Sequence, residues 1–232
     1  MHHVSVSTRF FQIDSAGPAR ILRLSASDST NRLTRACVLA LTDELSKADL
    51  RSHPLIIAGN RQFFSVGADL TEIAALTGPA AYEFSAMGQA LMSTVASHPT
   101  PVIAAIEGHC MGGGLDLALA CHHRIAAPQA TFGHRGAALG LITGWGGTQR
   151  LPRLIGKARA LELFITAEKI AAAQALEIGL VDAIADNSVT AALKRISVSA
   201  IRRNWLQHDL RTTTGKSIDS SIAPSNSAGE RF

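Results

Sequence analysis

Two stretches of this chain contain only apolar residues and are its clearest strand signals. Leu55–Gly59 (LIIAG) and Pro101–Ile106 (PVIAAI) have the composition of strands that are covered on both faces of a sheet. Shorter apolar runs predict further strands at residues 10–13, 20–24, 124–127 and 131–133, and at the start of 63–70. These runs predict a sheet built largely from buried strands.

Helical spacing separates these strands. Residues Thr34 to Lys47 read as a helix, because Val38, Leu41 and Leu45 share one face and Thr34 is a suitable N-cap. Helices are also predicted at 80–97, from 115 onward, at 156–165, at 171–178 and around 188–203, with a glycine-rich loop at 140–147. Strands alternate with helices from residue 20 to 183, which predicts an α/β core of repeated strand–strand–helix units.

Composition narrows the class of protein. Of 232 residues, 47% are hydrophobic and 17% charged, which is typical of a compact folded chain. No apolar run reaches the roughly 18–20 residues that a membrane span needs, and the start lacks the apolar core of a secretion signal. The net charge of +4 suits a small anionic ligand, and we expect neither a membrane nor a nucleic acid as partner.

The cysteines indicate the compartment. Cys37, Cys110 and Cys121 are odd in number and lack the spacing of a zinc site or a C-x-x-C motif. Reduced thiols in the cytoplasm are the simplest interpretation, and no metal site is expected.

The stretch 105–129, AIEGHCMGGGLDLALACHHRIAAPQ, carries candidate chemistry. A helical pattern opens directly after Gly112, Gly113 and Gly114, so its first N–H groups are unpaired and the helix dipole favours negative charge there. Such an end can hold an anion or a developing oxyanion. Asp116 lies three residues beyond Gly113, hence on the same face. The alternative is that the glycines serve close packing and that the dipole alone favours the aspartate.

A second glycine turn, Val66-Gly67-Ala68-Asp69, decides between these interpretations. If neighbouring strands carry the two turns, the amides of Ala68 and Gly113 converge on one oxygen. Two backbone donors on one carbonyl make an oxyanion hole.

Several successive segments together resemble the crotonase (enoyl-CoA hydratase/isomerase) superfamily. They are FFSVGADLTEI, AAIEGHCMGGGLDLALAC, RIAAPQATFG and LGLITGWGGTQRLPRLIGKARALELFITAEKIAAAQALEIGLVDAI, and they run from about residue 20 to 185. The resemblance implies a spiral of ββα units as an acyl-CoA-binding core over 1–185. Family members usually continue with two or three further helices, whereas this chain becomes polar and rich in Gly, Ser and Pro from about Arg211, so we expect 186–232 to be a short helical segment with a polar tail. The resemblance also implies association into homotrimers or hexamers.

The resemblance further implies chemistry through a thioester enolate, with CoA as part of the substrate and no separate cofactor. The thioester carbonyl would lie between the amides of Ala68 and Gly113, with Asp116 as the acid/base. Substrate contacts are implied for Val66, Asp69, Leu70, Gly112, Gly136 and Trp145.

Two positions depart from the hydratase pattern. Asp116 stands where hydratases of the superfamily have a first glutamate, and Gly136 stands where they have the second. Hydration needs a base for water and a proton for Cα, so one carboxylate would have to serve both steps. Isomerases of the superfamily work with a single carboxylate that carries a proton from C2 to C4.

Other groups near position 136 are further alternatives. A naphthoate-synthase branch also has this glycine and binds bicarbonate, and His134 and Arg135 would favour an anion, although Thr143 replaces an aspartate of that branch. His134 could instead act as the second acid/base, or be a solvated histidine at a loop edge. We therefore expect an enoyl-CoA hydratase or isomerase, the alternative being a non-catalytic or regulatory homologue that binds CoA esters or RNA.

Overall fold

A seven-stranded sheet runs through the part of the chain, residues 6–198, that the computed structural model describes. Its spatial order is β1-β2-β3-β4-β6-β8-β11, with β1 to β3 antiparallel and the remaining pairs parallel. The strands are β1 (Val6–Ser7), β2 (Phe11–Ala16), β3 (Ala19–Leu24), β4 (Leu55–Ala58), β6 (Val102–Ile106), β8 (His123–Ala126) and β11 (Ala183–Ile184).

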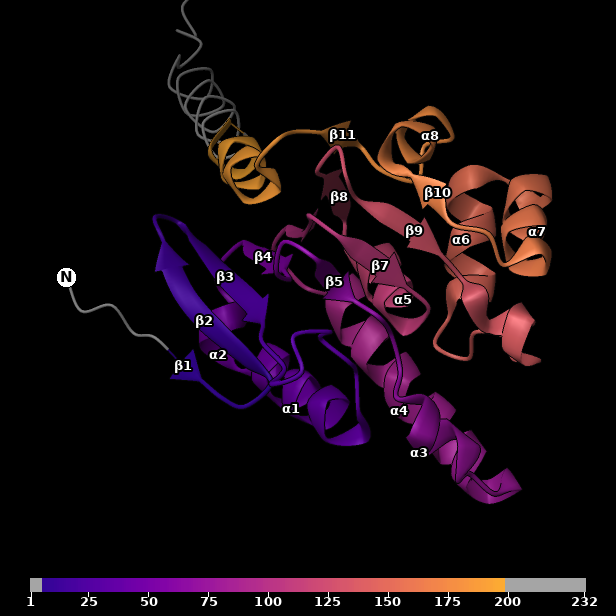
Figure 1. The fold of residues 1–232 in the computed structure, drawn as a ribbon. Coiled ribbons are helices and arrows are strands. Elements are labelled where there is room, and N and C mark those ends of the chain that lie inside the picture. The colour runs from indigo at the N-terminus through magenta and orange to yellow at the C-terminus, as the bar shows by residue number, and fades with distance from the viewer. Residues whose placement is uncertain (1–5, 199–232) are drawn as a thin grey trace, which may run out of the picture. The chain divides into compact units, whose positions relative to one another are not determined.

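A second, four-stranded sheet in the same residues has the order β10-β9-β7-β5. It consists of β5 (Phe63–Ser65), β7 (His109–Met111), β9 (Thr131–Gly133) and β10 (Ile170–Ala171). Strands β5, β7 and β9 are parallel to one another, and β10 pairs with β9 antiparallel. Each of β4, β6 and β8 in the larger sheet continues into β5, β7 or β9 in the smaller one and then into helical structure (Figure 1). The predicted repetition of strand–strand–helix units is confirmed.

The helices largely follow the expected pattern. They are α1 (Arg35–Ser46), α2 (Ala48–Arg51), α3 (Leu70–Ala74), α4 (Gly78–Ala96), α5 (Gly113–Ala120), the 3₁₀ helix η1 (Arg135–Leu139), α6 (Gly147–Ile155), α7 (Lys157–Thr166) and α8 (Ala172–Glu177). A further helix begins at residue 188. The Thr34 hydroxyl accepts a hydrogen bond from the Cys37 N–H at 3.2 Å, so the predicted N-cap of α1 is confirmed.

The sequence interpretation missed several short or weakly patterned elements, among them β7, α3 and α6. Strand β7 has only three residues between Gly108 and Gly112, too few to show a period. Helix α3 has five residues. Helix α6 opens on a glycine and contains Pro152, and both residues weaken a helical signal. The expected tail from Arg211, and the end of the helix expected at 188–203, lie outside the described residues.

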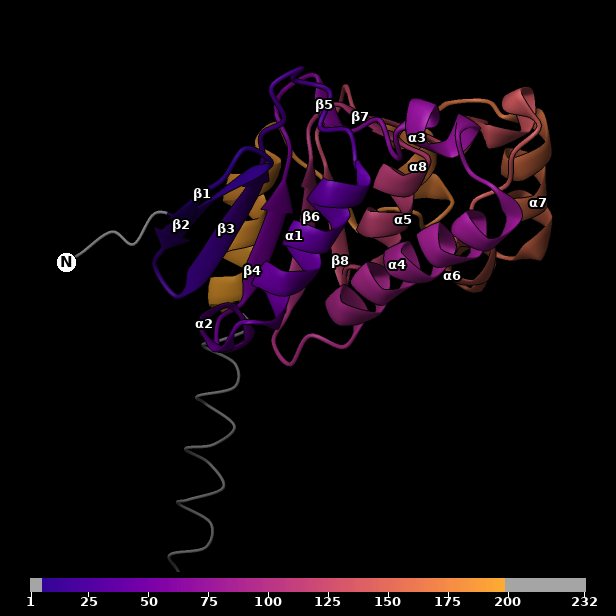
Figure 2. The same cartoon turned by 90° about the horizontal axis from the view of Figure 1, so that it is seen from below.

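The larger sheet is covered on both faces, as its apolar strands predicted. Successive side chains of a strand point to opposite faces. Within β4, Leu55 and Ile57 join the core cluster that includes α1, α4 and α5, whereas Ile56 joins a cluster with Ala192 and Ile196. Figure 2 shows α1 and α4 on one side of this sheet and the helix that begins at residue 188, in gold, on the other. Within residues 6–198, no helix has the length and apolar character needed to cross a membrane.

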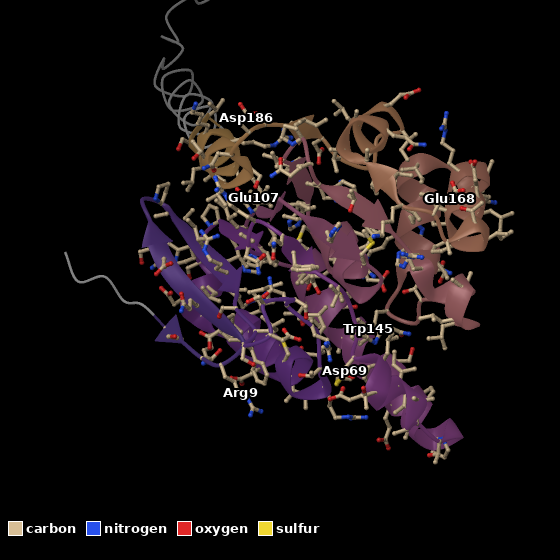
Figure 3. All side chains as sticks on the ribbon, in the orientation of Figure 1. Arg9, Asp69, Glu107, Trp145, Glu168 and Asp186 are labelled. Atoms are coloured by element: carbon tan, nitrogen blue, oxygen red, sulfur yellow. The ribbon has the colours of Figure 1, made fainter. Side chains whose placement is uncertain are left out.

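Trp145 holds helices α4 and α5 together. The residue, labelled in Figure 3, is 3% exposed. Its ring centroid lies 5.3 Å from that of Phe84, and its indole N–H donates to the Phe84 carbonyl at 3.2 Å. The indole also lies against two glycines: a Cβ at Gly88 of α4 would come within 2.1 Å of it, and one at Gly113 of α5 within 2.6 Å. Both helices therefore need glycine where the indole packs.

We predict that Gly88→Ala destabilises the fold by about 1–3 kcal/mol, the usual cost of overpacking a dense core. The new methyl group would lie 2.1 Å from the buried indole of Trp145, so the indole or helix α4 has to shift. Gly78→Ala in the same helix is the matched control, since nothing lies within 4 Å of a Cβ there. Urea unfolding of the two variants measures the difference, and equal stability would contradict the packing role.

Candidate active site

Two glycine turns meet at the end of the smaller sheet. One follows β5 at Val66–Ala68 and the other follows β7 at Gly112, and the two strands are parallel neighbours. Gly67 has a φ of +93°, and a Cβ on it would lie 2.7 Å from the Met111 carbonyl oxygen and 2.8 Å from the Gly113 nitrogen. Only glycine allows the turns to come this close. The expectation that neighbouring strands carry the two turns is confirmed.

The backbone amides of Ala68 and Gly113 lie near each other across this contact. A Cβ built on Gly113 would be 3.3 Å from the Ala68 nitrogen. Helix α5 begins at Gly113, so the N–H groups of its first turn have no acceptor within the helix. The positive end of the helix dipole adds to their attraction for negative charge. Both residues border the same cavity.

The cavity has a volume of about 830 Å³ and gathers most of the expected site residues. Those that line it are Val66, Ala68, Leu70, Gly112, Gly113, Asp116, Gly136 and Trp145. Asp69 is the one expected site residue that does not line the cavity. Its carboxylate caps α3 by accepting from the N–H groups of Thr71 and Glu72, and it pairs with Arg32 at 3.1 Å. Its side chain thus stabilises the loop beneath the cavity wall.

Apolar side chains form much of the cavity wall and its rim. Leu139, Ile142, Leu161 and Ile165 line the cavity and are each more than half exposed. An exposed apolar rim of this kind marks a surface suited to an apolar ligand. Arg135 and Lys169 also line the cavity and place positive charge beside this apolar wall. Within residues 6–198, no three His, Cys, Asp or Glu side chains come together as a metal site would require.

Asp116 is a buried carboxylate in this cavity. It is 1% exposed, and burial raises its pKa to about 7, although the Thr143 hydroxyl, the charge of Arg150 and the Gly147 amide act in the opposite direction. A group with a pKa near neutrality can both accept and return a proton. The helical spacing that predicted Asp116 beside Gly113 is consistent with this position.

His134 is buried, so the expectation of a solvated histidine at a loop edge was wrong. It is 4% exposed, its ring lies 5.2 Å from that of Phe164, and its Nε2 is 3.4 Å from Asp116 Oδ1. Burial lowers its pKa to about 4, which keeps the imidazole neutral at pH 7. Helix α7, which supplies Phe164, covers a segment that looks exposed in sequence.

The sequence interpretation gave Thr143 no role, yet its hydroxyl donates a hydrogen bond to Asp116 Oδ2. Thr143 stands in the loop before α6, far from Asp116 along the chain. The available signal was the glycine-rich loop 140–147, which lets backbone approach the cavity closely. Among residues 6–198, Asp116 is the one carboxylate that lines the cavity. Gly136 adds none, and a Cβ there would lie 2.8 Å from the Leu141 carbonyl oxygen.

We predict that Thr143→Val raises the pKa of Asp116 above about 7. The hydroxyl stabilises the ionised carboxylate, and a hydrogen bond to a charged group contributes about 1.5–3 kcal/mol, or about one to two pH units. Carbon-13 NMR of the Asp116 carboxyl across pH measures the change. Thr143→Ser, which keeps the hydroxyl, is the control. An unchanged or lower pKa in the valine variant would show that this hydrogen bond does not set the titration.

Comparison with known proteins identifies the family. A family model described as enoyl-CoA hydratase/isomerase matches residues 19–207. A probable enoyl-CoA hydratase of Bacillus subtilis (strain 168) is 48% identical over 136 residues, which cover 58% of this chain and 53% of the relative. The match thus spans about half of that relative's length.

Solved structures share the fold. DspI of Pseudomonas aeruginosa is similar with a TM-score of 0.78 and 31% identity, over 84% of this chain and 81% of that one. The enoyl-CoA hydratase of Bacillus anthracis gives 0.73 and 36%, over 82% of this chain and 75% of that one. This chain belongs to the enoyl-CoA hydratase/isomerase family of the crotonase superfamily.

Proposed function

We propose that this chain binds an acyl-CoA thioester and moves a proton on its acyl group through an enolate. The observation that carries the proposal is a single buried carboxylate, Asp116, in an apolar cavity that also contains two close-set backbone amides, those of Ala68 and Gly113. Each part supplies one requirement of enolate chemistry: a base, a site for the oxyanion, and exclusion of water.

The thioester oxygen becomes negative as the enolate forms. In the proposed complex it accepts hydrogen bonds from the Ala68 and Gly113 amides, which the backbone holds in place before the reaction. Such preorganised donors cost no rearrangement in the transition state, and loss of one typically lowers the rate by about 10²–10³. The apolar wall receives the acyl chain, while Arg135 and Lys169 are available to the anionic CoA portion.

Isomerisation of a 3-enoyl to a 2-enoyl thioester needs only one acid/base. The C2–H bond breaks, its electron pair enters the enolate, and the proton moves to the Asp116 carboxylate. The same carboxyl then protonates C4, and the double bond shifts to C2–C3. A pKa of about 7 for Asp116 matches this reversible role.

Hydration is less favourable in this site. Water addition requires a held nucleophile together with a proton for Cα, and Gly136 offers no side chain for the second task. Gly136→Glu is not a clean gain-of-function test, because its Cβ would meet the Leu141 carbonyl oxygen at 2.8 Å. The segment from 136 to 141 would have to shift to admit the new side chain.

We predict that Asp116→Asn lowers turnover of enoyl-CoA esters by at least about 10², the low end for loss of a positioned acid/base. Acetoacetyl-CoA, which mimics the enolate, should still bind this variant more tightly than free CoA does, because the amides are untouched. Steady-state kinetics and calorimetry measure the two effects. A fully active Asn variant would show that Asp116 is not the acid/base. Equal affinity for acetoacetyl-CoA and free CoA would contradict the assignment of the oxyanion hole.

We also predict that the unmodified protein isomerises 3-enoyl-CoA faster than it hydrates crotonyl-CoA, by about tenfold or more, since the second task of hydration has no dedicated group. Both reactions can be followed by the absorbance of the conjugated thioester. Hydration at about 10 s⁻¹ or above, the ordinary rate for enzymes, would show that a second acid/base operates in water addition.

A further inference from the structure

Two buried polar atoms, one from Asp116 and one from His134, lie close together in the cavity, and the Gly147 amide also acts on the carboxylate. Asp116 Oδ1 and His134 Nε2 are 3.4 Å apart, and within residues 6–198 neither forms a hydrogen bond that meets ordinary geometry. The other carboxylate oxygen, Oδ2, already accepts from the Thr143 hydroxyl. Buried polar atoms are nearly always hydrogen-bonded, so each exception needs a physical explanation, and a catalytic role is one of them.

The close approach of Asp116 and His134 depends on the glycine at the start of helix α6. A Cβ at Gly147, the first residue of α6, would lie 2.2 Å from Asp116 Oδ1 and 3.0 Å from His134 Nε2. Any other residue at 147 would therefore separate or displace the pair. Phe164 of α7 packs against the imidazole and the Thr143 hydroxyl donates to the other carboxylate oxygen, so both members of the pair are held in place. Hydrogen bonds of acid/base groups are often long before substrate binds and shorten in the complex.

We propose that Asp116 and His134 act as one acid/base unit that carries a single exchangeable proton between Oδ1 and Nε2. The proposal rests on the proposed function and adds a second resting place for the substrate proton. When the C2–H bond breaks, its electron pair enters the enolate and its proton reaches Asp116. The proton can then move to His134 Nε2, which leaves a carboxylate beside an imidazolium. The reverse movement returns it for delivery to C4, so no other reactant is needed.

The surroundings of the pair leave it with one proton, for which Asp116 is the more stable site. Burial raises the pKa of Asp116 to about 7 and lowers that of His134 to about 4, so one proton remains on the pair between these values. Arg150 of α6 favours the ionised carboxylate, and Cys110 of β7 is a buried thiol whose pKa burial raises. Arg135 and Lys169 border the same cavity. Titrations of two groups this close belong to the pair and not to either residue.

The test compares His134→Gln with Asp116→Asn. Glutamine can donate a hydrogen bond to Oδ1 but cannot carry the proton. We therefore expect kcat for isomerisation to fall about tenfold, which is less than the roughly 10²–10⁴ expected for loss of a full acid/base. Affinity for acetoacetyl-CoA should be unchanged. The rising limb of the pH–rate profile should move to lower pH, because the proton then has one resting place and the amide stabilises the carboxylate.

His98→Gln is the matched control. His98 is also 4% exposed with an unpartnered Nε2, but it does not line the cavity, so its change should leave the kinetics and the pH profile as they are. If Asp116→Asn is inactive while His134→Gln keeps the original kcat and profile, the shared-proton unit is wrong and the proposed function stands. An active Asp116→Asn would instead reject the proposed function.

The unmodified protein gives a measurement that does not depend on a folded variant. Carbon-13 NMR of the Asp116 carboxyl and nitrogen-15 NMR of the His134 ring should each report both titration steps, since a shared proton affects both groups. Two independent single-step titrations, one for each residue, would overturn the proposal.

Discussion

The contact between the two glycine turns is the constraint on which the site depends. A side chain at Gly67 would collide with the Met111 carbonyl and the Gly113 nitrogen, so strands β5 and β7 could not end side by side. Trp145 also packs against Gly113, where a Cβ would meet its indole at 2.6 Å. The amides of Ala68 and Gly113 are therefore positioned by packed backbone with no adjustable side chain between them. Such rigidity is what an oxyanion site requires.

The features that could be predicted from the sequence are those with local causes. LIIAG and PVIAAI predicted covered strands because burial on both faces demands apolar residues throughout, and Thr34 predicted a helix start because its hydroxyl caps within three residues. Strand β7 could not be predicted in this way, since three residues show no period. It is fixed instead by pairing with β5 and β9, and Gly108 ahead of it must be glycine because a Cβ would lie 2.1 Å from the Gln62 carbonyl oxygen.

The same division applies to the cavity. Helical spacing placed Asp116 beside Gly113, and the order of the glycine motifs brought Ala68 to the same place. The contacts of Thr143 and His134 with the carboxylate could not be predicted, because they join segments far apart in the chain. Whether His134 is buried depends on Phe164 of α7, and no local pattern around position 134 contains that information. Burial of a polar group depends on tertiary contacts. Here it decides whether His134 is a surface histidine or a partner of Asp116.

Burying a carboxylate and an imidazole side by side also limits how strongly the fold responds to pH. Asp116 has its folded pKa raised from 3.8, so alone it would lose stability as pH rises toward about 7. His134 has its folded pKa lowered from 6.5, so alone it would lose stability as pH falls toward about 4. Between about 4 and 6.5 the unfolded chain keeps one proton on these two residues, on the histidine, and the folded pair also keeps one. The two opposing dependences therefore offset each other, because folding relocates a proton without binding or releasing it.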